Sequence, residues 1–127
     1  MFIEKETDEI SGKIIGAAYK VAGVLGYGFL EKVYENAMVL ELEESGLKVV
    51  NQYPMFVYYK EKEVGEYFAD LYVEDSVIVE LKTASAIAPI HKAQLLNYLR
   101  ATNKEIGLLI NFGSSGVEVK RVLNNKN

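Results

Sequence analysis

The chain has 127 residues, half of them hydrophobic, and a formal net charge of −4 at neutral pH. This length suits one globular core and is too short to divide comfortably into two, so we expect a single domain over residues 1–127. Because the chain has no cysteine, disulfides, thiolate catalysis and cysteine-based zinc fingers are excluded. The negative charge argues against a general binder of nucleic acid, whose phosphates it would repel.

Neither a secretory signal nor a membrane span is expected. The first ten residues are rich in charge, and no apolar run approaches the roughly 20 residues that a transmembrane helix needs. We therefore expect a soluble protein in the cytoplasm with no membrane partner. The lack of cysteine fits such a reducing compartment.

Two helices are predicted in the first third of the chain. Apolar residues recur at helical spacing over residues 8–22 and again over residues 30–42. Between them, glycines at positions 23, 26 and 28 interrupt the pattern, and Ser45 with Gly46 ends the second helix. This part of the chain is predicted to be a helical pair joined by a glycine-rich bend.

The remainder is predicted to be mainly β-structure, because β-branched and aromatic residues dominate several short segments. Strands are expected at residues 49–59, 66–73, 77–82, 106–112 and 117–123. Polar turns are expected at residues 60–65 and 74–76. A helix is predicted to begin at Pro89 and to end near Asn103. This order of elements predicts an α/β fold, a mixed β-sheet flanked by helices on both faces.

The hairpin around residues 74–76 carries the most informative pattern. If these three residues form the turn, counting outward along both strands places Asp70 opposite Glu80. Like charges at such positions are destabilising, and a divalent cation between the carboxylates, with Lys82 beside it, would compensate. A two-residue turn would shift the register by one and separate the two acids.

Alternation of side chains predicts which residues of this hairpin share a face. One face would hold Ala69, Leu71, Val73, Val77, Val79 and Leu81, and the other Phe68, Asp70, Tyr72, Ile78, Glu80 and Lys82. Charges on the second, mainly apolar face need a compensating partner. In the competing interpretation the carboxylates face water at strand ends, and Glu80 with Lys82 is a surface ion pair.

Two separated motifs are similar to those of a known family. Residues 28–34 spell the GxxExxY signature, and Asp70 followed by Glu80 and Lys82 resembles the core of the PD-(D/E)XK nucleases. Ala69 stands where the name of the motif has proline. The chain thus resembles the GxxExxY protein family of the PD-(D/E)XK superfamily over most of its length. The resemblance implies a restriction-endonuclease-like core.

Metal chemistry follows from this resemblance. Asp70 and Glu80 would hold one or two Mg²⁺ ions, or Mn²⁺, and the backbone carbonyl of Leu81 would complete the shell. Such a metal activates water and neutralises charge on a phosphodiester, while Lys82 would orient the attacking water. Glu31 resembles the additional acidic ligand of the superfamily. Without the resemblance it would be an ordinary acid in the first turn of a helix.

Three residues of the predicted third helix, His91, Gln94 and Tyr98, share one helical face and could line the site. Gln94 resembles the family residue that hydrogen-bonds near the metal shell, and Tyr98 and Tyr34 could position Glu31, Lys82 or the scissile phosphate. Tyr34 is expected to be mainly structural. His91 could be a general base or a phosphate contact, but a lone histidine near a helix start is often a surface or capping group, and we do not expect it to ligate metal.

The resemblance implies a Mg²⁺-dependent nuclease acting on nucleic acid, with DNA expected ahead of RNA. The alternative is a nuclease-fold protein with little or no activity that binds or regulates, which the negative net charge favours. A third interpretation is hydrolysis of another phosphoester. A basic rim could be formed by Lys92, Arg100, Lys104, Lys120 and Arg121. The chain could act alone, as a homodimer or as a module of a larger assembly.

Overall fold

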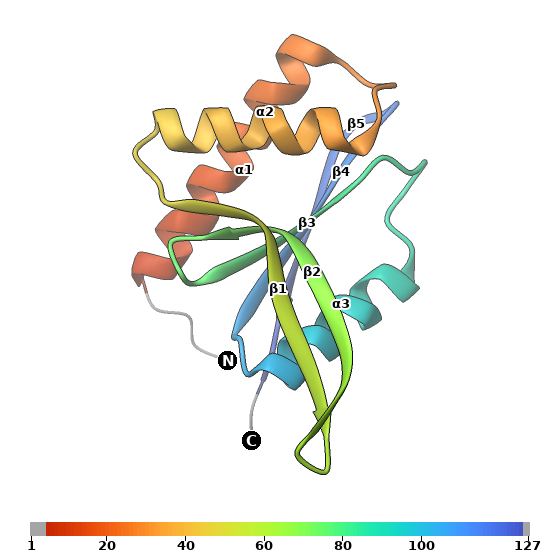
Figure 1. The fold of residues 1–127 in the computed structure, drawn as a ribbon. Coiled ribbons are helices and arrows are strands. Elements are labelled where there is room, and N and C mark those ends of the chain that lie inside the picture. Colours follow the sequence, from red (N-terminus) through yellow and green to blue (C-terminus); the bar gives the residue numbers. More distant parts are fainter. Residues whose placement is uncertain (1–4, 126–127) are drawn as a thin grey trace.

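Five strands and three helices make up the part of the chain that the computed structural model describes, residues 5–125. The elements are α1 (Lys5–Leu25), α2 (Glu31–Glu44), β1 (Val49–Tyr59), β2 (Lys62–Val73), β3 (Val77–Lys82), α3 (Pro89–Thr102), β4 (Ile106–Gly113) and β5 (Gly116–Leu123) (Figure 1). The strands form one sheet in the order β1-β2-β3-β4-β5. Strands β3 and β4 are parallel and the other neighbours are antiparallel.

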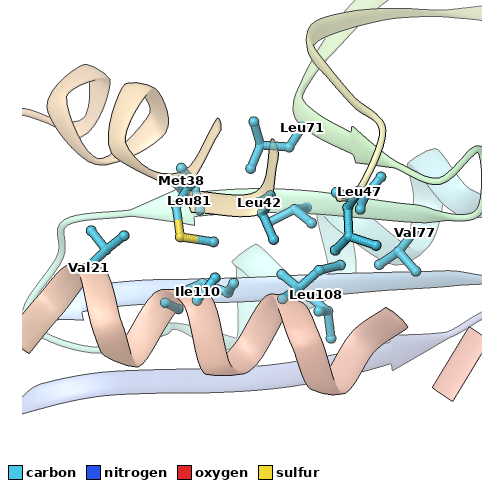
Figure 2. Packing of buried hydrophobic residues seen from close by; sticks show 14 of the residues in the cluster. Val21, Met38, Leu42, Leu47, Leu71, Val77, Leu81, Leu108 and Ile110 are labelled. Carbon is cyan, nitrogen blue, oxygen red and sulfur yellow. The ribbon is translucent and has the colours of Figure 1, made fainter. Parts of the chain in front are cut away.

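Helices cover both faces of the sheet, as predicted. On one face, α1 and α2 place Val21, Met38 and Leu42 against apolar side chains of β2, β3 and β4 (Figure 2). On the other face, Leu95 and Leu99 of α3 pack on the sheet. The central strands β3 and β4 are therefore buried on both sides, which explains their nearly continuous apolar sequence. The predicted fold class is confirmed.

The glycine-rich bend lies between α1 and α2. Helix α1 runs past Gly23 and ends before Gly26, whose φ of 71° lies in the left-handed region. Gly28 has a φ of 107°, which residues with a side chain rarely adopt. Two of the three glycines therefore form the bend. Separately, no helix among residues 5–125 is long and apolar enough to cross a membrane.

The hairpin of β1 and β2 is longer than the sequence predicted. Its turn consists of Lys60 and Glu61, which both have left-handed backbones, with φ of 51° and 65°. Residues 62–65 were expected in the turn and instead belong to β2. This end of the hairpin extends beyond the helices (Figure 1), so its strand residues are solvated. Their polar character therefore resembled that of a loop.

The turn at residues 74–76 has the predicted length, and the register is confirmed, because Val73 pairs with Val77 and Leu71 with Val79. One predicted face is wrong, since Ala69 belongs to the core under α3 whereas Leu71 belongs to the core under α1 and α2. The regular alternation is therefore broken at this point of β2. On the neighbouring strand Gln52 has a left-handed φ of 53° between two regular pairs.

Candidate functional site

Two acidic side chains meet where the pairing of β2 and β3 ends. The regular register stops at Leu71 and Val79. Beyond it, the N–H of Asp70 donates to the Glu80 carboxylate at 3.0 Å, and the N–H of Leu81 donates to the Asp70 carboxylate at 2.8 Å. Each carboxylate thus takes the place of a backbone acceptor. This exchange of hydrogen bonds fixes both acids at the carboxyl end of β3, beside the parallel strand β4.

The environment of these two acids opposes their ionisation. Glu80 is only 9% exposed, and burial, followed by the charge of Asp70, raises its pKa to about 7. Burial also raises the pKa of Asp70, although the Leu81 N–H lowers it. A close pair of carboxylates, one buried and one half-buried, with raised pKa values is typical of functional sites and favours a bound cation.

Glu31 and Lys82 lie near the same pair. Burial and then the charge of Asp70 raise the pKa of Glu31, the first residue of α2. Burial raises the pKa of all three carboxylates, whereas the Lys82 ammonium lowers it. The ion pairs found within residues 5–125 do not include Lys82. The Lys82 charge therefore lowers the pKa of all three acids without forming an ion pair with any one of them.

The possible metal ligands around Asp70 and Glu80 satisfy a hard divalent cation only in part. Among the residues that the structure describes, no three acidic or histidine side chains come close enough to hold a metal together. The N–H of Leu81 points at Asp70, and N–H and C=O of one strand residue face the same neighbour, so the Leu81 carbonyl faces this site too. Two carboxylates and one carbonyl are suitable ligands for Mg²⁺ when water or substrate supplies the rest.

A buried hydrogen-bond network that the sequence did not predict lies behind Asp70. The Glu35 carboxylate, 4% exposed, accepts hydrogen bonds from Lys32 at 2.7 Å, Gln52 at 2.8 Å and Asn51 at 3.3 Å. The Gln52 amide nitrogen also lies 3.5 Å from an Asp70 carboxylate oxygen. Gln52 therefore connects a buried acid of α2 to the candidate site. The position of Glu35, four residues after Glu31 on the same helical face, was the available signal.

The three predicted residues of α3 have different environments. His91 accepts the N–H of the residue before Pro89 at 3.0 Å, so it caps the helix. Gln94 is exposed and makes no side-chain hydrogen bond within the described part of the chain. Tyr98 stacks on Tyr67, with ring centroids 3.5 Å apart, and Tyr67 interacts with the Glu80 carboxylate. Tyr98 is therefore connected to the Glu80 carboxylate through Tyr67.

Tyr34, the last residue of the GxxExxY signature, stabilises the glycine-rich bend between α1 and α2. It is fully buried, and its hydroxyl donates to the Gly26 carbonyl at 2.6 Å and accepts the Phe29 N–H at 3.5 Å. Its ring stacks on Phe112 with centroids 4.3 Å apart. These contacts agree with the structural role expected from the sequence.

Replacing Tyr34 with phenylalanine should lower the free energy of unfolding by about 1 to 3 kcal/mol, because a buried carbonyl loses its donor. Urea unfolding measures this loss, and the exposed Tyr19→Phe serves as the control. Mg²⁺ affinity should remain within about twofold. A variant with wild-type stability and impaired metal binding would contradict the structural role.

Two of the five residues predicted to form a basic rim do not contribute to it. The Lys104 ammonium donates to the Tyr72 hydroxyl at 3.2 Å and lies 4.9 Å from the centre of that ring. Arg121 forms an ion pair with Asp8 of α1 at 3.0 Å. Both cations are held by other parts of the fold, so they are not available as a rim around the carboxylates.

The raised pKa of Glu80 makes the metal-free protein less stable as the pH rises. Above pH 4.5 the unfolded chain loses a proton that folded Glu80 keeps until about pH 7, so the free energy of unfolding falls across this window. The fall should be on the order of 3 kcal/mol. Urea titrations with EDTA at pH 5 and pH 8 measure it, and Glu80→Gln should show a smaller fall. Stability that increases between these pH values would contradict this reasoning.

A mixed sheet with helices on both faces carries an acid pair at the carboxyl end of its central strand β3. The family model described as PD-(D/E)XK nuclease superfamily matches residues 8–122. The chain belongs to this superfamily.

Two solved structures share the fold at low identity. "Crystal structure of SSO0001" matches with a TM-score of 0.59 and 17% identity, covering 94% of this chain and 60% of that one. An alkaline exonuclease (LHK-Exo) from Laribacter hongkongensis matches with a TM-score of 0.54 and 11% identity, covering 98% and 73%. The chain therefore spans 60% of the first structure's length, which is less than two thirds. No curated protein matches it significantly.

Proposed function

We propose that this protein is a metal-dependent nuclease of the GxxExxY family that hydrolyses phosphodiester bonds of DNA, with Mg²⁺ or Mn²⁺ as the cofactor. Membership of the PD-(D/E)XK superfamily supports nuclease activity. The observation that carries the proposal is the exchange of N–H bonds that places the Asp70 and Glu80 carboxylates together at the end of β3. Their raised pKa values make a divalent cation the natural partner.

Each residue of the site has a proposed role. Asp70 and Glu80 would hold the metal together with the Leu81 carbonyl, and Glu31 would contribute through a bridging water, since no three acidic side chains of residues 5–125 come close enough to bind one ion together. A bound divalent cation supplies a water of lowered pKa and neutralises charge on the phosphodiester. The Lys82 ammonium stabilises the negative charge that develops on the phosphate during attack.

Residues of α3 and β2 assist this site. Tyr98 stacks on Tyr67, and we assign to this stack the role of orienting the Glu80 carboxylate. Gln94 is exposed on α3, where its amide is free to contact a substrate. These assignments make Tyr98 a positioning residue and Gln94 a substrate contact.

A second candidate function is that of a binding or regulatory module that cleaves nucleic acid weakly or not at all. The net charge of −4 and the engagement of Lys104 and Arg121 elsewhere favour it, because few cations remain to attract a polyanion. Two copies of the chain would be needed to cut both strands at once, so a homodimer belongs to the nuclease proposal for duplex DNA.

Cleavage assays decide between the two functions. Labelled single- and double-stranded DNA and RNA are incubated with the protein in Mg²⁺, Mn²⁺ or EDTA, with Asp70→Asn as the control. The nuclease proposal expects cleavage of DNA that requires metal and is absent in the variant. The absence of cleavage in either metal would favour the binding or regulatory module.

A further inference from the structure

A cavity of about 330 Å³ lies next to the carboxylate site and has no role in the chemistry above. Its walls come from residues 27–29, 83–85 and 112–114. The chain ties it to the site on two sides, because position 83 directly follows Lys82 and position 29 is two residues before Glu31. In Figure 1 the bend between α1 and α2 lies at the same end of the molecule as the tip of β4 and β5.

Buried polar side chains hold two walls of this cavity. Tyr34 fixes the glycine bend through its hydroxyl. Asn111, 1% exposed, accepts the Ala84 N–H and donates to the Ala84 carbonyl, both at 2.9 Å. A Cβ at Gly113 would come within 3.0 Å of the Asn111 amide and 3.2 Å of the Ala84 carbonyl. Buried polar side chains thus fix the backbone of two of the cavity's walls.

The residues that line the cavity are uncharged. They offer the ring of Tyr27, which is 66% exposed, and that of Phe29, 47% exposed. Hydroxyl groups are available from Thr83, Ser85 and Ser114. A phosphate would find no cation here, whereas a nucleobase would find aromatic faces for stacking and hydroxyls for its polar edge.

We propose that this cavity binds an unpaired nucleobase of the substrate strand, adjacent to the phosphodiester that is cut. The inference rests on the proposed nuclease function and narrows its substrate. A base in the cavity has left its own stack, and unstacking costs least where the nucleotide is already single-stranded. Single strands, gaps and frayed ends should therefore be cut in preference to a continuous duplex.

A fluorescent reporter tests this pocket directly. The chain has no tryptophan, so Tyr27→Trp introduces a single one at the cavity. In a Lys82→Met background, which is expected to bind metal and to cleave only slowly, the protein is titrated with oligothymidylate in Mg²⁺. Stacking of a base should quench the emission, and an abasic oligomer of equal length should not. Tyr19→Trp on the exposed surface of α1 is the control and should stay unchanged.

Binding is followed in parallel by fluorescence anisotropy of a labelled oligonucleotide. Tyr27→Ala should weaken binding about tenfold, as expected for loss of one stacked base, with Mg²⁺ affinity unchanged. If the oligonucleotide binds but quenching is absent, or the abasic oligomer quenches equally, the pocket inference is overturned and the nuclease proposal stands. If no oligonucleotide binds to the wild-type protein, both are overturned.

Discussion

Glu80→Gln is expected to abolish metal-dependent cleavage and to weaken Mg²⁺ binding by on the order of 100-fold or more. Glutamine keeps an oxygen that can accept the Asp70 N–H, which donates to Glu80 at 3.0 Å. The substitution therefore removes the charge while preserving the backbone bond. Alanine would remove both, so its effect on stability would mix two causes of opposite sign.

The same variant should be more stable than the wild type without metal. Burial and the charge of Asp70 raise the pKa of Glu80 to about 7. At pH 8 the wild type therefore bears the free-energy cost of ionising a buried carboxyl group, and the variant has no such group. The gain should be on the order of 1 to 3 kcal/mol. Urea unfolding in EDTA measures it, with the exposed Glu66→Gln of β2 as the matched control. Lower stability together with intact metal binding would favour a structural network.

Lys82→Met should reduce cleavage by about 10²- to 10³-fold, the usual effect of removing a charge that stabilises a transition state. Metal affinity should persist, because the ammonium is a cation and not a ligand. Burial raises the pKa of the nearby carboxylates and Lys82 lowers them. Its removal should therefore shift metal binding to somewhat higher pH. Calorimetric titration at pH 7 and pH 8 separates this shift from the loss of cleavage.

The control for this variant is Lys62→Met, which removes an exposed lysine from β2 and should leave cleavage unchanged. Full activity in Lys82→Met would show that the lysine has no role in the reaction. Loss of metal binding at both pH values would instead show that Lys82 organises the acidic pair.

The central hairpin was predictable because one local quantity, the length of a turn, determines its register. The three-residue turn after Val73 places Leu71 opposite Val79, and Asp70 and Glu80 follow at the next position. The sequence could not show that regular pairing stops there or that Ala69 changes face. Both features coincide with the left-handed backbone of Gln52 on the neighbouring strand.

Parts of the site that depend on contacts between distant segments were not predictable. Glu35 on α2 meets Gln52 on β1, and Gln52 meets Asp70 on β2. No local pattern reports such contacts. Tyr67 likewise acquires its place beside Glu80 through tertiary packing. The helix-capping role of His91 was one of the alternatives that its position near a helix start suggested.

Calorimetric titration of Mg²⁺ and Mn²⁺ into the wild type and Glu80→Gln is the most direct test of the proposed metal site at Asp70 and Glu80. The wild type should bind metal and release a proton below about pH 7, because Glu80, whose pKa is about 7, must ionise to become a ligand. The variant should show neither heat of binding nor this proton release. The absence of binding at millimolar metal, or equal binding by both proteins, would contradict a metal site formed by these two carboxylates.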